Sequence, residues 1–234
     1  MRGKVTDEIY YGDKSFLSNS DIGTLLTDPA SFKKEKEKTV AMVKGSYFHS
    51  IILEPDKVVS FRIIDSTTRS TNKYKEESNG DVILLRHESD EIKRMADTLI
   101  GNFDVYNAIY DTDNKFEIAE SGIILDNPWK GKADILGKEK IIDLKTTSDL
   151  DGFKYSARKY NYDSQAWVYN QLFGLPVEFI VIEHETCRIA WFVCSDDFLD
   201  YGRQKAEKAT DVYNMFYGPN ATHDINQYYK IDTL

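Results

Sequence analysis

The sequence predicts an α/β (α+β) fold with a mixed central sheet flanked by helices, and three observations lead to this prediction. Helical periodicity dominates residues 1–110, three consecutive strand patterns follow between 115 and 146, and a helix then separates two further strand patterns. A strand–helix–strand segment of this kind indicates a right-handed parallel crossover. The 234 residues are 41% hydrophobic and contain no Gly/Ser-rich or Pro-rich linker, so we expect one domain over 1–234.

The first part of the chain is expected to be helical. Ser18 or Asn19 is a suitable cap for the first helix, and prolines at positions 29 and 55 mark helix boundaries. The polar stretch 66–80 predicts a mobile loop. The expected helices cover about 19–29, 29–38, 42–53 and 88–101.

The second part, residues 115–195, is expected to form the sheet. Its last two strands are separated by a short turn and read as a hairpin, after which Asp196 is placed to cap a long helix over 196–217. The expected strands cover 115–125, 129–136, 140–146, 177–183 and 187–194, with a helix over 162–173.

Composition excludes several classes of protein. No apolar run approaches the roughly 18 residues of a membrane span, and no apolar stretch follows the basic start, so we expect a cytoplasmic protein with no membrane partner. Cys187 and Cys194 are too few for a four-cysteine cluster, and their offset on one strand keeps them apart. The net charge of −9 argues against nucleic-acid binding through overall charge, but allows a local positive groove or a carboxylate site that a metal neutralises.

The segment WKGKADILGKEKIIDLKTT (129–147) is the most informative one. A hairpin with a four-residue loop at 137–140 places Asp134 opposite Asp143, with Cβ atoms roughly 4.5–5.5 Å apart, and puts Lys145 on the same face. Opposed carboxylates repel unless a proton or a cation such as Mg²⁺ lies between them. The alternative is a surface hairpin whose acids pair with nearby lysines, and the pattern alone slightly favours it.

Two further features bear on this choice. His49 lies on an apolar helix with Gly45 and Ser46 one turn before it, and a lone histidine there is more often a hydrogen-bonded core residue than a ligand. Gln165 and Tyr169 share one face of the helix after the second aspartate, where packing and solvation are the ordinary explanations. Each signal is weak by itself.

Together these residues resemble the PD-(D/E)XK nuclease superfamily in its RecB-like branch. The segments 17–32, 45–55, 119–125 and 159–169 are most similar to phage RecE-type exonucleases (exonuclease VIII and its relatives). The resemblance covers nearly the whole chain and implies a restriction-endonuclease-like core. The matching residues, in order, are His49, Asp134, Asp143-Leu144-Lys145 and Gln165-x-x-x-Tyr169.

The resemblance also implies roles for these residues. Lys145 is assigned to catalysis, Glu120 matches an acidic position on the preceding strand, and Gln165 and Tyr169 match a motif that shapes the site and contacts DNA. One departure is Ala133, which stands where the superfamily name has proline. The metal is assigned to His49, Asp134, Asp143 and the carbonyl of Leu144.

The function implied by the resemblance is phosphodiester hydrolysis with Mg²⁺, or with Mn²⁺ because one ligand is an imidazole. Such enzymes act at ends of linear double-stranded DNA, degrade one strand 5′ to 3′ and leave 3′ single strands. The implied partners are double-stranded DNA ends and a single-strand annealing protein, with a ring-shaped homo-oligomer in a bacterial host cell. Candidate phosphate contacts are Arg158, Lys159, Lys154 and Lys132.

Other functions stay open from the sequence. Within nucleases, the alternatives are a RecB-like endonuclease and a single-strand exonuclease. From another class, a non-catalytic nucleic-acid-binding module could have kept the fold. The intact Asp134, Asp143 and Lys145 argue against that module, because catalytic groups are the first to be lost in such proteins.

Overall fold

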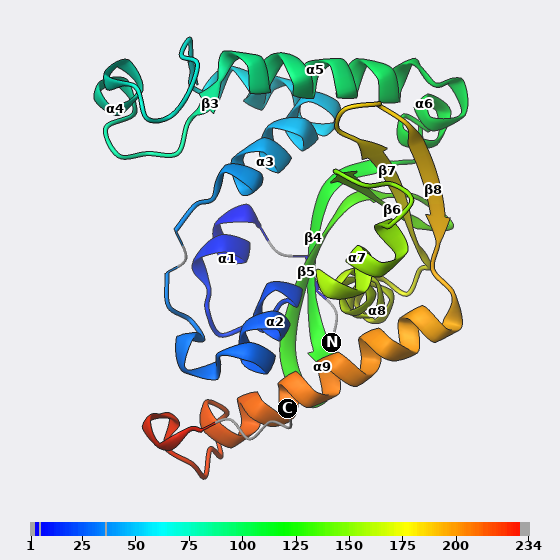
Figure 1. Ribbon diagram of the computed structural model, residues 1–234. Coiled ribbons are helices and arrows are strands. Elements are labelled where there is room, and N and C mark those ends of the chain that lie inside the picture. Colours follow the sequence, from blue (N-terminus) through cyan, green and yellow to red (C-terminus); the bar gives the residue numbers. More distant parts are fainter. Residues whose placement is uncertain (1–2, 5, 36, 230–234) are drawn as a thin grey trace.

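A computed structural model describes residues 3–4, 6–35 and 37–229, and a six-stranded mixed sheet lies at its centre (Figure 1). The strand order is β1-β4-β5-β6-β7-β8. All neighbouring pairs are antiparallel except β6 and β7, which are parallel. The strands are β1 Gly3–Lys4, β4 Lys115–Ile124, β5 Asn127–Leu136, β6 Ile141–Thr147, β7 Val177–Glu183 and β8 Ile189–Val193.

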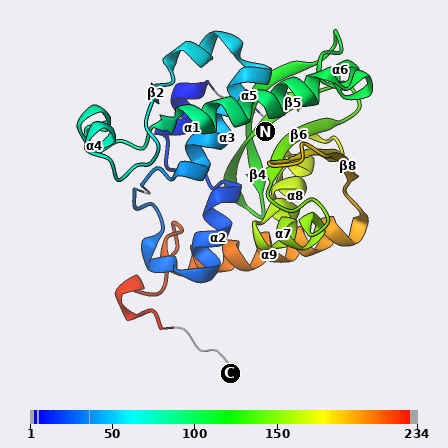
Figure 2. The same ribbon diagram turned by 45° about the horizontal axis from the view of Figure 1, so that its top comes forward.

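Helices cover both faces of this sheet and give two hydrophobic cores. One core joins the sheet to α2, α7, α8 and α9, and the other joins it to α3, α5 and α6. Figures 1 and 2 accordingly show α5 and α9 on opposite sides of the sheet. The helices are α1 Asp7–Gly12, α2 Asn19–Thr27, α3 Val40–Leu53, α4 Asn72–Ser78, α5 Arg86–Gly101, α6 Phe103–Ile109, α7 Phe153–Lys159, α8 Tyr162–Phe173 and α9 Asp196–Phe216.

The predicted α/β fold with a mixed, helix-flanked sheet is confirmed. The register of the central hairpin is also as expected, since Leu136 pairs with Ile141 and Ile135 with Ile142. The chain then passes through α7 and α8 and returns as β7, parallel to β6, with Asp143 beside Phe179. This crossover brings α8 against β4 and β5, where the candidate site residues lie.

Several local predictions were wrong. In the described parts of the predicted helix, residues 29–35 and 37–38, the helical element is a 3₁₀ turn, Pro29–Ser31, because Lys33 adopts a left-handed backbone (φ 63°) and the charged residues after it have no apolar face to bury. The polar stretch 66–80 contains α4, which Thr71 caps and buried Tyr74 anchors beside the short parallel pair β2 Ile63–Ile64 and β3 Leu84–Leu85. The short helices α1, α6 and α7 were not predicted.

Strand β8 is shorter than expected because Cys187 lies in a turn with φ 54°, and Cys187 and Cys194 are both free thiols. Among the described residues, every helix is too short or too polar to cross a membrane.

Candidate metal centre

The two aspartates lie where β5 and β6 stop pairing regularly. The last regular pair is Ile135–Ile142. Beyond it, the backbone N–H of Leu144 donates to Asp134 Oδ2 at 2.8 Å, so it bonds to a side chain of β5 and not to a backbone carbonyl. Asp134 is 8% exposed and Asp143 only 1% exposed. The surface-hairpin alternative is therefore wrong, because both acids are enclosed and Lys140 pairs with Glu178 instead.

His49 reaches this point from α3. Its neighbours Tyr47 and Phe48 are buried in the core, which fixes the helix so that the imidazole faces β6. The Nε2 atom lies 2.9 Å from the Leu144 carbonyl oxygen, and Nδ1 lies 3.5 Å from Asp134 Oδ2. The structure thus brings His49, Asp134 and the Leu144 carbonyl together, although they are far apart in the sequence.

The acidic residue of β4 near this group is Glu117, and the choice of Glu120 is corrected. Glu117 falls between the pairs Phe116–Ile135 and Ile118–Ala133, which places it across from Asp134. Glu120 pairs with Gly131, three residues further along β4, and is not among the side chains whose ligand atoms come together at this point. Glu117 has φ 54°, a left-handed conformation that is unusual for glutamate in a strand.

Lys145 and Gln165 both contact Asp143. The Lys145 ammonium is in direct ionic contact with Asp143 Oδ1 and lies 4.7 Å from the centre of the Tyr162 ring. The Gln165 side-chain amide donates to Asp143 Oδ2 at 2.6 Å. One turn later on α8, the Tyr169 hydroxyl donates to the Lys132 carbonyl at 2.6 Å, so Gln165 and Tyr169 hold the two strands of the hairpin from one helix face.

Burial and like charge shape the protonation of these groups. Burial, together with the nearby Asp134 carboxylate, raises the pKa of Asp143 to about 6. Burial by itself would lower the pKa of His49, but attraction to Asp134 outweighs it and raises that pKa to about 9. Burial and Asp134 also raise the pKa of Glu117. Burial opposes the charge of Lys145, yet Asp143 and Asp134 raise its pKa, so the ammonium stays protonated.

The donor set at this point suits a hard divalent cation. His49, Glu117 and Asp134 each offer one ligand atom, and these atoms lie within 4.8 Å of one another. Crowded carboxylates that repel one another are stabilised by a cation, and carboxylate and carbonyl oxygens are what Mg²⁺ prefers. The single imidazole also makes the group suitable for Mn²⁺. The residues present therefore fit the implied metal.

The four candidate phosphate contacts divide into two kinds. Lys132, predicted as a candidate phosphate contact, is only 8% exposed and its ammonium pairs with Glu117 at 2.8 Å, so it is buried beside the candidate metal centre. Lys154, Arg158 and Lys159 all lie on α7 with exposed side chains.

A cleft of about 560 Å³ opens beside the candidate metal centre. Gly45 and His49 of α3 line one wall, and Lys145 lies at the end of β6 that forms its floor. Phe153 and Ser156 of α7 line another part of it. The cleft is therefore continuous with the basic helix α7.

An Asp…Asp-x-Lys hairpin on a mixed sheet, joined by a histidine from one helix and a Gln-x-x-x-Tyr pair from another, defines the PD-(D/E)XK class. The family model described as "PDDEXK-like domain of unknown function (DUF3799)" matches residues 27–218, and the chain belongs to this family. A comparison with curated proteins gave no match.

One solved structure shows the same fold. A "Putative exonuclease" from Eubacterium rectale is similar with a TM-score of 0.65 at 17% sequence identity, over 91% of this chain and 86% of that chain. A phage-related exonuclease from Haemophilus somnus 129PT is similar with a TM-score of 0.38 at 14% identity, over 86% of this chain and 94% of the other. The first of these likenesses supports the fold assignment.

Proposed function

We propose that this protein is a metal-dependent DNA exonuclease that hydrolyses phosphodiester bonds at ends of linear double-stranded DNA. One observation carries the proposal: His49, Glu117, Asp134, Asp143 and Lys145 converge beside one cleft. Three of them are crowded acids, of which Asp134 and Asp143 are buried and Glu117 is partly buried. Such an arrangement is unfavourable for stability unless it serves to bind a cation. The adjacent lysine supplies the fixed positive charge that hydrolysis of a phosphate ester needs.

A divalent metal held by His49, Glu117 and Asp134 would supply a Lewis acid that neutralises charge on the phosphate and lowers the pKa of water. Lys145, kept protonated by its two acidic neighbours, stabilises the negative charge that develops on the phosphate. Gln165 fixes the orientation of the Asp143 carboxylate through its 2.6 Å hydrogen bond. Tyr169 holds the backbone at Lys132, next to the position of Asp134.

The finer parts of the proposal rest on the resemblance to RecE-type exonucleases. We propose digestion in the 5′ to 3′ direction, with 3′ single strands as the product for annealing recombination. The corresponding partners are double-stranded DNA ends, a single-strand annealing protein and other copies of this chain in a ring. The similarity of segments 45–55 and 159–169 to that group supports these points.

A digestion assay tests the proposal. Purified protein with Mg²⁺ should shorten linear duplex DNA, leave closed circles intact and stop when EDTA is added. Labels at the 5′ or the 3′ end report the direction of digestion. Nicking of closed circles would favour an endonuclease instead, and DNA binding without hydrolysis under any divalent metal would favour a non-catalytic module.

A further inference from the structure

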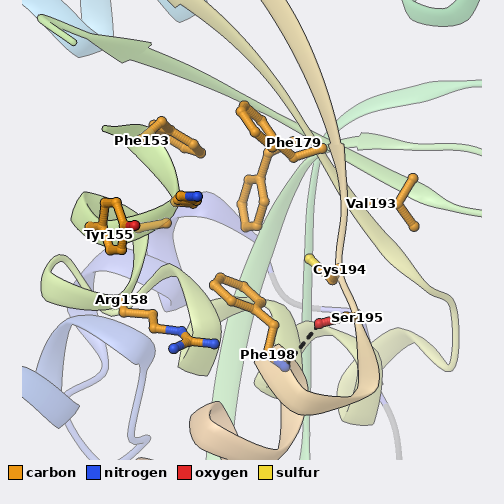
Figure 3. A pocket seen from close by; sticks show the side chains of 11 residues that line it. Phe153, Tyr155, Arg158, Phe179, Val193, Cys194, Ser195 and Phe198 are labelled. Atoms are coloured by element: carbon orange, nitrogen blue, oxygen red, sulfur yellow. Dashed lines mark hydrogen bonds between the residues drawn. The ribbon is translucent and has the colours of Figure 1, made fainter. Parts of the chain in front are cut away.

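A second cavity, here called the aromatic cavity, lies beside the cleft of the candidate metal centre. Its volume is about 320 Å³, which is at the lower end of the range for small-ligand sites. Figure 3 shows α7 on one side of it and the end of β8, leading into α9, on the other. The lining side chains that matter here are Phe153, Phe179, Phe192 and Phe198, together with Lys154, Arg158 and Val193.

The walls of the aromatic cavity are flat rings. Phe153 and Phe192 stack with centroids 5.0 Å apart and an angle of 30° between their planes. Phe179 and Phe198 meet edge to face at 6.4 Å, and Figure 3 shows their rings beside the same space. Phe153 and Phe179 are each only 2% exposed, so the partly exposed rings of Phe192 and Phe198 are the ones that offer surface to an occupant. Such a surface favours a flat, aromatic occupant, because rings pack on one another by offset stacking and by edge-to-face contact.

The rim of the aromatic cavity on α7 is positive. Lys154 and Arg158 line this rim and are exposed. Among the described residues, neither has an ion-pair partner. The Arg158 guanidinium lies 4.4 Å from the centre of the Tyr201 ring, which holds it in place without neutralising it. In a chain with a net charge of −9, this local excess of positive charge suits an anionic ligand.

The aromatic cavity is also next to the catalytic lysine. Phe153 lines both the cavity and the cleft, and the centre of the Phe179 ring is 5.8 Å from the Lys145 ammonium. A DNA strand with one phosphate at Lys145 therefore brings the base of a neighbouring nucleotide to the aromatic cavity. The rings would then meet the base while α7 meets the phosphates.

We propose that the aromatic cavity binds an unpaired base of single-stranded DNA, an inference that rests on the proposed nuclease function. The occupant combines a flat aromatic ring with a phosphate backbone, which matches the rings and the positive rim respectively. Sites of this kind hold single strands mainly by stacking, with little dependence on base sequence. The cavity would keep one strand separated from its complement beside the cleft.

Binding to two single strands tests this proposal. Fluorescence anisotropy in EDTA compares the binding of a short labelled oligothymidylate with that of an abasic strand of the same length. Both strands offer the same phosphate contacts, and the salt concentration is kept fixed because those contacts depend on it. We expect the wild type to bind the strand with bases roughly tenfold more tightly. Ser195 also lines the aromatic cavity, is exposed, and caps α9 with its hydroxyl. Ser195→Asp keeps a capping side chain, places a charge at the lip of the cavity, and should abolish that preference.

The matched control is Val59→Asp, since Val59 is 90% exposed on the 3₁₀ turn Pro55–Ser60, away from the aromatic cavity. This control should keep the wild-type ratio of the two affinities. Equal affinity of the wild type for both strands, or an unchanged ratio in Ser195→Asp, would overturn the proposal. If the protein digests duplex DNA but shows no preference for the strand with bases, only the proposal of base binding in the aromatic cavity is refuted. If it shows that preference but digests no DNA, base binding is supported and the proposed nuclease function is refuted.

Discussion

Asp143 and Glu183 lie on neighbouring parallel strands and are both enclosed, yet their surroundings have opposite effects. Arg188, Thr186 and the backbone N–H of Leu150 all donate to Glu183, and these bonds lower its pKa to about 2. Burial and the nearby Asp134 carboxylate both disfavour the charged form of Asp143, and together they raise its pKa to about 6. The negative charge of Glu183 is thus already stabilised by hydrogen-bond donors of the protein. The negative charge of Asp143 would be stabilised further by a bound cation.

The comparison separates an acid whose charge is balanced by partners within the protein from the acids of the candidate metal centre, which repel one another. The Glu183 network ties the start of the loop before α7 to the end of β7, through the 2.9 Å bond from Leu150. The carboxylates around Asp143 oppose folding through their mutual repulsion, as expected of a site that stabilises a ligand. Substitutions in the two regions should therefore act on different properties.

The largest effect is expected from the catalytic side of the comparison. Asp143→Asn and Lys145→Ala should each lower the rate of duplex digestion by a factor of roughly 10²–10³ or more, because charge stabilisation at the reacting phosphate is lost. The rate of nucleotide release with Mg²⁺ measures this, with circular dichroism as the check on folding. Asp151→Asn, on an exposed loop, is the control, and near-wild-type rates in Asp143→Asn would contradict the assignment.

A second prediction separates the two acids of β4. Glu117→Gln should raise the Mg²⁺ concentration needed for half-maximal activity by roughly 10–100-fold or more. Loss of a residue that only supports a metal ligand already has an effect of that size, and Glu117 would be a ligand itself. It should also reduce the increase in Tm that Mg²⁺ gives the wild type, because a ligand stabilises the state it binds. Glu120→Gln is the matched control and should leave both quantities unchanged. Equal behaviour of the two variants would remove Glu117 from the metal centre.

The smallest effect is expected at Glu183, and it depends on pH. Its pKa is lowered from 4.5 to about 2 in the folded protein, so its contribution to stability is complete above about pH 4.5 and disappears as the pH falls toward 2. Glu183→Gln should lower Tm by a few degrees at neutral pH while leaving digestion of DNA nearly unchanged. Urea midpoints followed by tryptophan fluorescence should converge with those of the wild type across that acid range. A gap that persists or widens on acidification would contradict this account.

The sequence predicted the parts of the molecule that follow from periodicity. Strand alternation over 129–147 gave the hairpin register, and the same-face spacing of Gln165 and Tyr169 identified the helix that supports the site. The pattern could not reveal that Asp134 would accept from a backbone N–H of β6, because this bond depends on the separation of the two strands. Fold class and hairpin register were therefore predictable, and detailed contacts were not.

The features that sequence reasoning missed were hidden for three different physical reasons. Glu117 has a left-handed backbone within β4, which no strand pattern indicates, and the prediction fell on Glu120 instead. Lys132 reads as a surface lysine, yet it is buried because Glu117 neutralises it at 2.8 Å. Helix α7 is only seven residues long, too short for its period to be recognised, although it carries the exposed basic residues.

The position of a bound metal tests the central claim most directly. Crystals grown with Mn²⁺ and measured at the manganese absorption edge should show an anomalous peak enclosed by His49, Glu117, Asp134 and Asp143, with the Leu144 carbonyl facing it. The same experiment on Asp134→Asn should lose the peak. A manganese peak away from these side chains in the wild type, in protein that nevertheless digests DNA, would contradict the account.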